Sequence, residues 1–453
     1  MVFDNDAILS RYAPMIEFET ISKAHADAEN LMPFQALYAY LQAAYPLVHR
    51  HLSCEVVQGA SLLYRWRGDG SSPAHPVALL AHLDVVPAGE LSLWKHPPFS
   101  LTREGGYVYG RGVFDNKCQL LAQMEAVEAL LKDGWSPHCD VYLCYGHNEE
   151  VLSAASGARA IVELLKSRGV RLGLVIDEGG CITDGAALGI PLRIAVIGLA
   201  EKGSADFLLT ARDEGGHSSQ PGPGTAVGRI ARAAVAIEQN PMPARLLRTV
   251  SKTLEAAAPY MGQGAAFALS HQKALRGPLK RLLGQKRATN AMIRTTTAVT
   301  MAQGAKAPNV LPESASITVN CRILPGDTVE SVRRHLCAVA GDDIEVTLLA
   351  GCEPSPQSLQ DETFDLVARL AGELAPDAVV IPYLMLAGSD ARHYHDICEH
   401  VYRFAPYYVD QASLASVHSA NERLPETGFD AAAEFYAKLL LSYGARPPGA
   451  PLP

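Results

Sequence analysis

Apolar residues along this chain occur either in short continuous runs or at helical spacing. A continuous run is typical of a strand that is buried on both faces, as in a covered parallel sheet. Such runs are found at residues 61–66, 77–81, 141–145 and 172–176. Between them, residues 117–131 and 156–167 carry apolar side chains on one helical face, and residues 5–50 are also helical in pattern. The alternation predicts an α/β fold with a mostly parallel sheet and helices on both faces.

The pattern changes near residue 199. Segments 205–211 and 314–322 alternate apolar with polar residues, as antiparallel strands with one exposed face do, and 328–349 reads as a helix and a strand. After residue 352 the first pattern resumes, with helices expected at 362–374 and 426–441 and strands at 379–384 and 400–404. We therefore predict a discontinuous catalytic domain, 1–199 and 352–453, and an inserted α+β domain, 200–351, with a helical insertion at about 241–287.

Composition narrows the class of protein. A chain of 453 residues usually forms more than one domain, and a net charge of −9 argues against a nucleic-acid binder. Nine cysteines without a CxxC pair, no signal-peptide pattern and no long apolar run predict a cytoplasmic protein without a membrane span. The helical stretch 241–287 is basic, which favours a solvated face over a polyanion or membrane-surface site.

Five polar side chains of metal-binding type follow the apolar runs. One histidine or carboxylate at a strand end is more often a core or capping residue, but five recurrences favour a metal site. Imidazole nitrogen and carboxylate oxygen suit divalent ions, and five ligands are too many for one tetrahedral ion with an open position. The set therefore predicts two ions that share a carboxylate. Its members are His82, Asp115, Glu150, Asp177 and His418.

Two further carboxylates stand beside these candidate ligands. Asp84 lies two residues after His82, where it can hold the second ring nitrogen and fix the tautomer. Glu149 adjoins Glu150 and is placed to accept a proton from an attacking water. Without the other ligands, Glu149 would be read as a surface residue at a helix start.

Six ordered motifs carry a family resemblance. They are AHLDVVP (81–87), GRGVFDNK (110–117), GHNEE (146–150), VIDEGG (175–180), EGGHSSQP (214–221) and VHSANE (417–422). In these the chain resembles the di-zinc metallopeptidase-20 family, which includes acetylornithine deacetylase, succinyl-diaminopimelate desuccinylase, aminoacylase-1 and carboxypeptidases. Segments 290–300, 309–329, 388–396 and 401–406 are most similar to the branch of carboxypeptidase S and the N-fatty-acyl-amino-acid synthase/hydrolase. Those relatives enter a secretory route, for which this chain shows no signal.

The resemblance implies a metal-dependent amide hydrolase with two zinc ions, cobalt or manganese being alternatives. His82 and Asp177 would hold one ion, Glu150 and His418 the other, and Asp115 would bridge them. Asp84 would orient His82, and Glu149 would act as general base and then as general acid. The substrate would be an N-acyl-amino acid or a short peptide cleaved beside a free carboxylate. A dipeptidase or carboxypeptidase, or a metal-binding homologue without turnover, is the alternative.

The resemblance also assigns roles in the inserted domain. His217 would donate a hydrogen bond to the oxyanion of the tetrahedral intermediate. In a homodimer, this His217 would come from the partner's lid. Asn309 and Arg322 would bind the substrate carboxylate. The backbone of Gly388 would contact the substrate beside it. A competing hypothesis is a monomer in which stretch 241–287 covers the pairing edge and lines an acyl pocket with Leu247, Val250 and Leu254.

Overall fold

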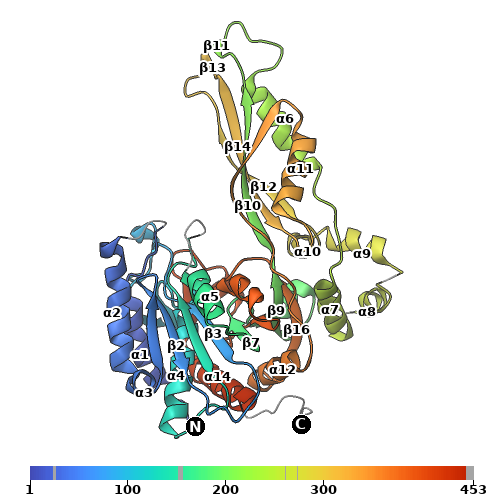
Figure 1. Cartoon of the computed structure of the whole chain (residues 1–453). Coiled ribbons are helices and arrows are strands. Elements are labelled where there is room, and N and C mark those ends of the chain that lie inside the picture. The colour runs from blue at the N-terminus through green and yellow to red at the C-terminus, as the bar shows by residue number, and fades with distance from the viewer. Residues whose placement is uncertain (24–26, 152–156, 261, 273, 445–453) are drawn as a thin grey trace.

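The computed structural model describes residues 1–23, 27–151, 157–260, 262–272 and 274–444. The chain forms a broad base, from which a long arm of strands and helices rises (Figure 1). We call this arm the lid (residues 203–240 and 295–352) and the connected helices at its foot the basic segment (residues 241–294). None of the helices within the described ranges is both long and apolar enough to cross a membrane.

A nine-stranded sheet forms the centre of the base. Along its main path the order is β1 (Ser53–Val57), β2 (Ser61–Trp66), β6 (Val141–Gly146), β3 (Val77–His82), β7 (Leu174–Asp177), β17 (Val401–Arg403), β9 (Arg193–Glu201) and β16 (Ala378–Met385), and β8 (Ile182–Asp184) pairs with β9. Strands β6, β3, β7 and β17 run parallel, as do β9 and β16. The carboxyl ends of β3, β6 and β7 therefore meet at one edge, where open α/β sheets build their sites.

Helices cover both faces of this sheet, which confirms the predicted fold class. On one face lie α1 (Asn5–Glu17), α2 (Ala28–Ala44), α3 (Pro46–His51), α4 (Lys117–Lys132), α12 (Glu362–Leu374) and α14 (Phe429–Gly444). On the other lie α5 (Gly157–Ser167) and the 3-10 turn η4 (Asp390–Asp396). Residue 156, the expected start of α5, lies outside the described residues.

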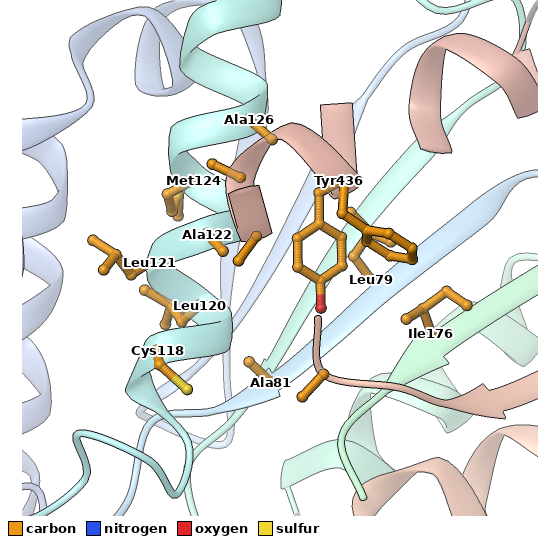
Figure 2. Packing of buried hydrophobic residues seen from close by; sticks show 14 of the residues in the cluster. Leu79, Ala81, Cys118, Leu120, Leu121, Ala122, Met124, Ala126, Ile176 and Tyr436 are labelled. Atoms are coloured by element: carbon orange, nitrogen blue, oxygen red, sulfur yellow. The ribbon is translucent and has the colours of Figure 1, made fainter. Parts of the chain in front are cut away.

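Helix α4 is buried along most of its length, because apolar side chains surround it. Its residues Leu120 and Met124 share one core with Leu79 of β3, Ile176 of β7 and Tyr436 of α14 (Figure 2). Helix α4 begins at Lys117, the last residue of the GRGVFDNK motif. The tightly packed helix therefore fixes the position of Asp115 relative to the strand ends.

The lid is an antiparallel sheet with the order β12 (Thr296–Gln303), β14 (Ser314–Ile323), β10 (Gly203–Arg212) and β15 (Ile344–Cys352). Alternate residues of β10 and β14 are buried beneath α6 (Ala226–Gln239) and α11 (Val329–Ala340). This is the exposed-face alternation that the sequence predicted. A two-strand ribbon, β11 (Gly216–His217) with β13 (Val310–Leu311), forms the tip of the lid (Figure 1).

The basic segment folds into α7 (Arg248–Ala257), η3 (Ala258–Tyr260), α8 (Gln263–Ser270), α9 (Arg276–Leu283) and α10 (Arg287–Ile293). The sequence predicted it as part of the inserted domain, and its apolar side chains pack mainly on strands β9 and β16 of the base. Val250 and Leu254 of α7 share a core with Leu384 of β16, and the Thr253 hydroxyl donates to the Pro382 carbonyl at 2.6 Å. Val250 and Leu254 are thus packed in a core, and Leu247 is partly buried against it.

Short elements complete the base. A three-stranded sheet joins β4 (Thr102–Glu104), β5 (Tyr107–Tyr109) and β18 (Arg423–Pro425), and the remaining short helices are η1 (Leu91–Leu93), η2 (Gly185–Leu188) and α13 (Gln411–Leu414). Pairing of β18 with β5 brings the VHSANE segment beside the GRGVFDNK segment. Two stretches about 300 residues apart in sequence therefore meet at the candidate site.

Candidate metal centre and active site

His82 is the last residue of β3 and is 1% exposed. Its Nε2 atom lies 3.0 Å from Oδ1 of Asp115 and 3.4 Å from Oε1 of Glu178. Its Nδ1 atom lies 3.0 Å from the carbonyl oxygen of Asp84. A ring held through Nδ1 by a backbone carbonyl directs the Nε2 lone pair outward, which is the usual arrangement of a metal-binding histidine.

Asp115 stands between the two histidines of the predicted ligand set. Its Oδ2 atom lies 3.0 Å from Nε2 of His418, which in turn is 3.1 Å from Oε1 of Glu150. The Asp115–Asn116 peptide bond is cis. His82, Asp115, Glu150 and His418 thus converge, and one carboxylate faces both imidazoles.

Glu178, and not Asp177, joins this group. Ligand atoms of His82, Glu149 and Glu178 lie within 4.8 Å of one another, as do those of His82, Asp115 and Glu150. The Asp177 carboxylate accepts the backbone N–H groups of Ala391 at 2.7 Å and of Glu178 at 2.8 Å. The structure thus gives Asp177 backbone partners and places its neighbour beside His82.

The electrostatics of the group favour a cation. Burial alone would lower the pKa of His82, but the carboxylates of Glu178 and Asp115 raise it well above its usual value. Hydrogen bonds to Asp115 and Glu150 raise the pKa of His418 to about 10. Several carboxylates that burial alone would neutralise are thus held close together, and divalent ions are the natural complement of such a donor set.

Asp84 aligns the residues around it. Its carboxylate oxygens accept the backbone N–H groups of Glu149 and Glu150, each at 3.1 Å. The same carboxylate lies 3.4 Å from Nδ1 of His82, and Asp84 is fully buried. One side chain therefore positions the strand-end histidine together with the GHNEE segment, a wider role than the ring contact that the sequence suggested.

Glu422 fastens the loop that carries Asp115. Its carboxylate accepts backbone N–H groups of Gly112, Phe114 and Asp115 at 2.9–3.1 Å, and Nη1 of Arg111 donates to it at 2.6 Å. The sequence did not predict this role, although Glu422 ends the VHSANE motif. A buried acid paired with an arginine and several N–H groups holds two distant loops together.

Arg392 was also missed by sequence analysis. Its Nη2 atom lies 3.3 Å from Oε1 of Glu149, and its Nε lies 3.6 Å from Oε1 of Glu201. Its Nε also donates to the carbonyl of Ser389 at 2.6 Å. The sequence showed only an arginine within the GSDARHYHD segment. Its contacts could not be predicted, because Glu149 and Glu201 are far away in sequence.

A cavity of about 300 Å³ adjoins the group. Its lining includes the polar side chains of Asp115, Glu149, Glu150, Glu178 and His418. It also includes Gly388 and the apolar side chains of Phe114, Met385, Leu414 and Val417. The cavity can therefore contact both polar and apolar groups of a ligand.

The remaining predicted site residues lie apart from this cavity. His217 is exposed at the tip of the lid, where Asn309 accepts a hydrogen bond from the N–H of Ser218 at 3.2 Å (Figure 1). Arg322 is exposed near the foot of β14, opposite Ser204 of β10. Of the four substrate-contacting residues that the sequence suggested, Gly388 is the one that lines the cavity.

Comparison with known proteins places this arrangement in a family. Residues 78–442 match peptidase family M20/M25/M40. The chain belongs to this family. Among curated relatives, this M20/M25/M40 peptidase is 32% identical over 440 residues to the probable carboxypeptidase S-like 2 of Dictyostelium discoideum, covering 96% of this chain and 84% of the relative. It is 34% identical over 417 residues to the N-fatty-acyl-amino acid synthase/hydrolase PM20D1 of Mus musculus, covering 90% and 82%.

Solved structures share the fold. The M20 family metallo-carboxypeptidase Sso-CP2 of Sulfolobus solfataricus superposes with a TM-score of 0.70 at 18% identity, over 96% of this chain and 99% of that one. Human carnosine dipeptidase 1 gives a TM-score of 0.66 at 18% identity, over 97% and 96%. Family membership and the predicted branch are confirmed. The M20/M25/M40 peptidase is accordingly a metal-dependent amide hydrolase that acts on a small-molecule substrate.

Proposed function

We propose that this M20/M25/M40 peptidase hydrolyses the amide bond of N-acyl-amino acids whose amino acid keeps a free carboxylate. One observation carries the proposal: Glu149 stands beside two histidines and three carboxylates that converge at one cavity. The similarity to an N-fatty-acyl-amino acid synthase/hydrolase supports the choice of substrate class. The apolar side chains in the cavity lining, Phe114 and Met385 among them, would contact the acyl group.

The donor set fits two divalent ions. His82 and Glu178 would hold one ion, Glu150 and His418 the other, and Asp115 would serve both, so that Glu178 takes the place that the resemblance gave to Asp177. Imidazole and carboxylate ligands favour zinc, and cobalt or manganese would also suit them. Bound ions would polarise the scissile carbonyl and lower the pKa of water.

The side chains of the chain itself would carry the proton. Glu149 lies among the ligands, and burial raises the pKa of its carboxyl well above the usual value. It would accept the proton of the attacking water and pass it to the leaving amine. Arg392, 3.3 Å away, would hold its carboxylate in one orientation.

The free carboxylate of the substrate would be bound from the lid. Arg322 offers a bidentate fork, and the backbone at Gly388 would add a single hydrogen bond. Asn309 lies beside His217 at the tip of the lid, so it would reach a substrate carboxylate together with His217, from the partner's lid. Arg322 lies beside the chain crossing at residues 202–204. A small rotation of the lid about that crossing would bring Arg322 toward the cavity.

A dipeptidase or carboxypeptidase is the second candidate. The similarity in fold to Sso-CP2 and to carnosine dipeptidase 1 favours it. A hydrolysis screen separates the two candidates. N-acyl-amino acids of increasing acyl length are assayed beside dipeptides, with zinc, cobalt and manganese in turn. We expect kcat/KM to rise with acyl length and to exceed that for any dipeptide. The reverse order would assign the enzyme to the dipeptidases.

Metal removal should abolish this activity. We expect two tight divalent sites per chain, because five ligands exceed what one open site uses. Dialysis against a chelator should remove the ions and the activity together, and zinc should restore both. Elemental analysis combined with the amide assay checks this. Full activity in a metal-free preparation would refute the metal requirement.

We also propose a homodimer that completes the site. His217 lies at the tip of the lid, far from the strand ends, so a partner's lid is a simple source of this donor (Figure 1). Strands β12 and β15 are the two edges of the lid sheet, and the basic segment packs on β16 of the base. This location argues against the hypothesis that the segment covers the pairing edge. A two-fold contact could then use a lid edge of both chains.

Mixing two inactive variants tests the shared site. Glu149→Gln and His217→Ala homodimers should each be weak, since an oxyanion donor contributes about 3 kcal/mol to lowering the barrier. After exchange of subunits, one site of each hybrid contains both wild-type groups and regains activity. Light scattering gives the mass. A monomer without rescue would show that His217 acts within its own chain or not at all.

A cytoplasmic location is the last part of the proposal. All nine cysteines are free, and Cys118, Cys144 and Cys398 are buried. Burial raises the pKa of the Cys144 thiol to about 12, which keeps it protonated and unreactive. Reduced core thiols suit a reducing compartment.

A further inference from the structure

The basic segment differs in charge from the rest of the chain. Residues 241–294 contain ten lysines and arginines against the single acidic residue Glu255, a net charge of +9. Since the whole chain carries −9, the remaining residues carry −18. A positive surface on a strongly negative protein has a preferred orientation toward any anionic surface, because the rest of the molecule is repelled.

Several of these cations are available for binding. Arg245 pairs with Asp327, and Lys252 pairs with Glu255. Five other cations in the described part of the basic segment form no ion pair or side-chain hydrogen bond within the chain. They are Arg248, Arg276, Arg281, Lys286 and Arg287, and all of them are exposed. Lys273 lies outside the described residues. Free arginines concentrated on one set of helices form a surface that lacks its anionic complement.

Two of these arginines flank a groove. A cavity of about 400 Å³ is lined by Leu246, Arg248, Ser251, Glu255, Gln272 and Arg276. The Gln272 side chain donates a hydrogen bond to Glu255 at 2.6 Å. The one carboxylate among the lining residues of the groove therefore already has a partner. Two guanidinium groups and a hydroxyl thus remain to receive an anionic group.

The same helices expose apolar side chains. Phe267 of α8 is 61% exposed, Leu282 of α9 is 59% exposed and Tyr260 of η3 is 41% exposed. Phe267 stacks on His271 with ring centroids 4.3 Å apart. Exposed aromatic and leucine side chains among lysines and arginines are typical of helices that lie in a lipid interface, and a soluble polyanion would need only the charges.

The inner face of the basic segment is held against the rest of the protein. Val250 and Leu254 pack into a core with Leu384 of β16, and Lys202 donates to the carbonyls of Ala291 and Arg294 at 3.1 and 2.9 Å. The inner face of the helices is therefore fixed. Strand β16 ends at Met385, which lines the catalytic cavity. Strand β16 would therefore be the element that separates a surface bound to the basic segment from that cavity.

We propose that the basic segment is a docking surface for an anionic lipid bilayer. Arg248 and Arg276 would bind an acidic headgroup in the groove, and Phe267 and Leu282 would enter the boundary between headgroups and acyl chains. The proposal is independent of the substrate proposed above, since it concerns only where the protein binds.

Vesicle sedimentation with the full chain tests this. We expect the protein to sediment with vesicles of phosphatidylglycerol and phosphatidylcholine, to stay in solution with phosphatidylcholine alone, and to be released by high salt. The variant R276E/R281E should bind the anionic vesicles at least tenfold more weakly. R333E/R369E is the matched control, because it changes the net charge equally at exposed arginines on α11 and α12. It should bind within twofold of the wild type.

A second variant separates lipid from other anions. Phe267→Ser removes an apolar side chain, so it should weaken vesicle binding several-fold. Because it keeps every charge, it should leave any binding of heparin or inorganic phosphate unchanged. No binding of the wild type to anionic vesicles at low salt, or equal losses in both double variants, would overturn the proposal. Tighter binding to heparin than to vesicles, unaffected by Phe267→Ser, would make the segment a polyanion site instead.

Discussion

The Glu149→Gln variant should turn over its substrate about 10²–10⁴-fold more slowly than the wild type while keeping its metal. Glutamine has the same shape, but its amide cannot accept the proton of the attacking water. The proposed ligands His82, Asp115 and Glu150 are unchanged, so metal content should hold. Steady-state kinetics and elemental analysis of the same preparation check both statements.

Glu201→Gln is the control for this experiment. Glu201 is also buried and lies 3.6 Å from Arg392, but it belongs to neither group of candidate metal ligands. A disturbed arginine would affect both variants, whereas loss of the base affects Glu149→Gln alone. Equal losses of turnover in the two variants would remove Glu149 from the role of base.

The second large effect concerns the adjacent acids Asp177 and Glu178. Glu178→Gln should weaken the binding of one ion by more than the 10–100-fold that outer-shell changes cost, because it removes a proposed ligand. Asp177→Asn should keep both ions, since its carboxylate is engaged by the N–H groups of Ala391 and Glu178. Titration of the metal-free protein with zinc measures both affinities.

Asp177→Asn should instead affect stability. An amide in place of the carboxylate turns an NH₂ group toward a backbone donor, and an unsatisfied buried group costs about 1–3 kcal/mol. The free energy of unfolding of the chelated protein should fall by about this amount. Loss of an ion in Asp177→Asn but not in Glu178→Gln would return the ligand role to Asp177.

These two acids show where sequence reasoning ends. A continuous apolar run predicts that a strand ends near residue 177, but successive side chains point to opposite faces. An error of one residue in the strand end therefore exchanges one acid for its neighbour. Predicted ligands in clearly separate motifs, such as His82 and His418, do converge on Asp115 in the structure.

The residues that sequence reasoning missed share a physical property. Glu422, Arg392 and Glu201 act through contacts with residues far away in the chain, and no local pattern reports such a contact. The α/β alternation was predictable, because burial on both faces imposes apolar runs. The packing of the basic segment on β16 was not, because its amphipathic pattern fits any apolar surface.

The order of the strands has a consequence for biosynthesis. Strand β7 ends at Asp177, and its neighbour β17 begins at Val401, roughly 220 residues later. At ordinary rates of translation, the apolar edge of β7 emerges on the order of ten to forty seconds before its partner. His418 and Glu422 follow later still. A nascent chain on the ribosome thus has an open sheet edge that chaperones can recognise. It completes the proposed catalytic centre only after the last segment of the base leaves the exit tunnel.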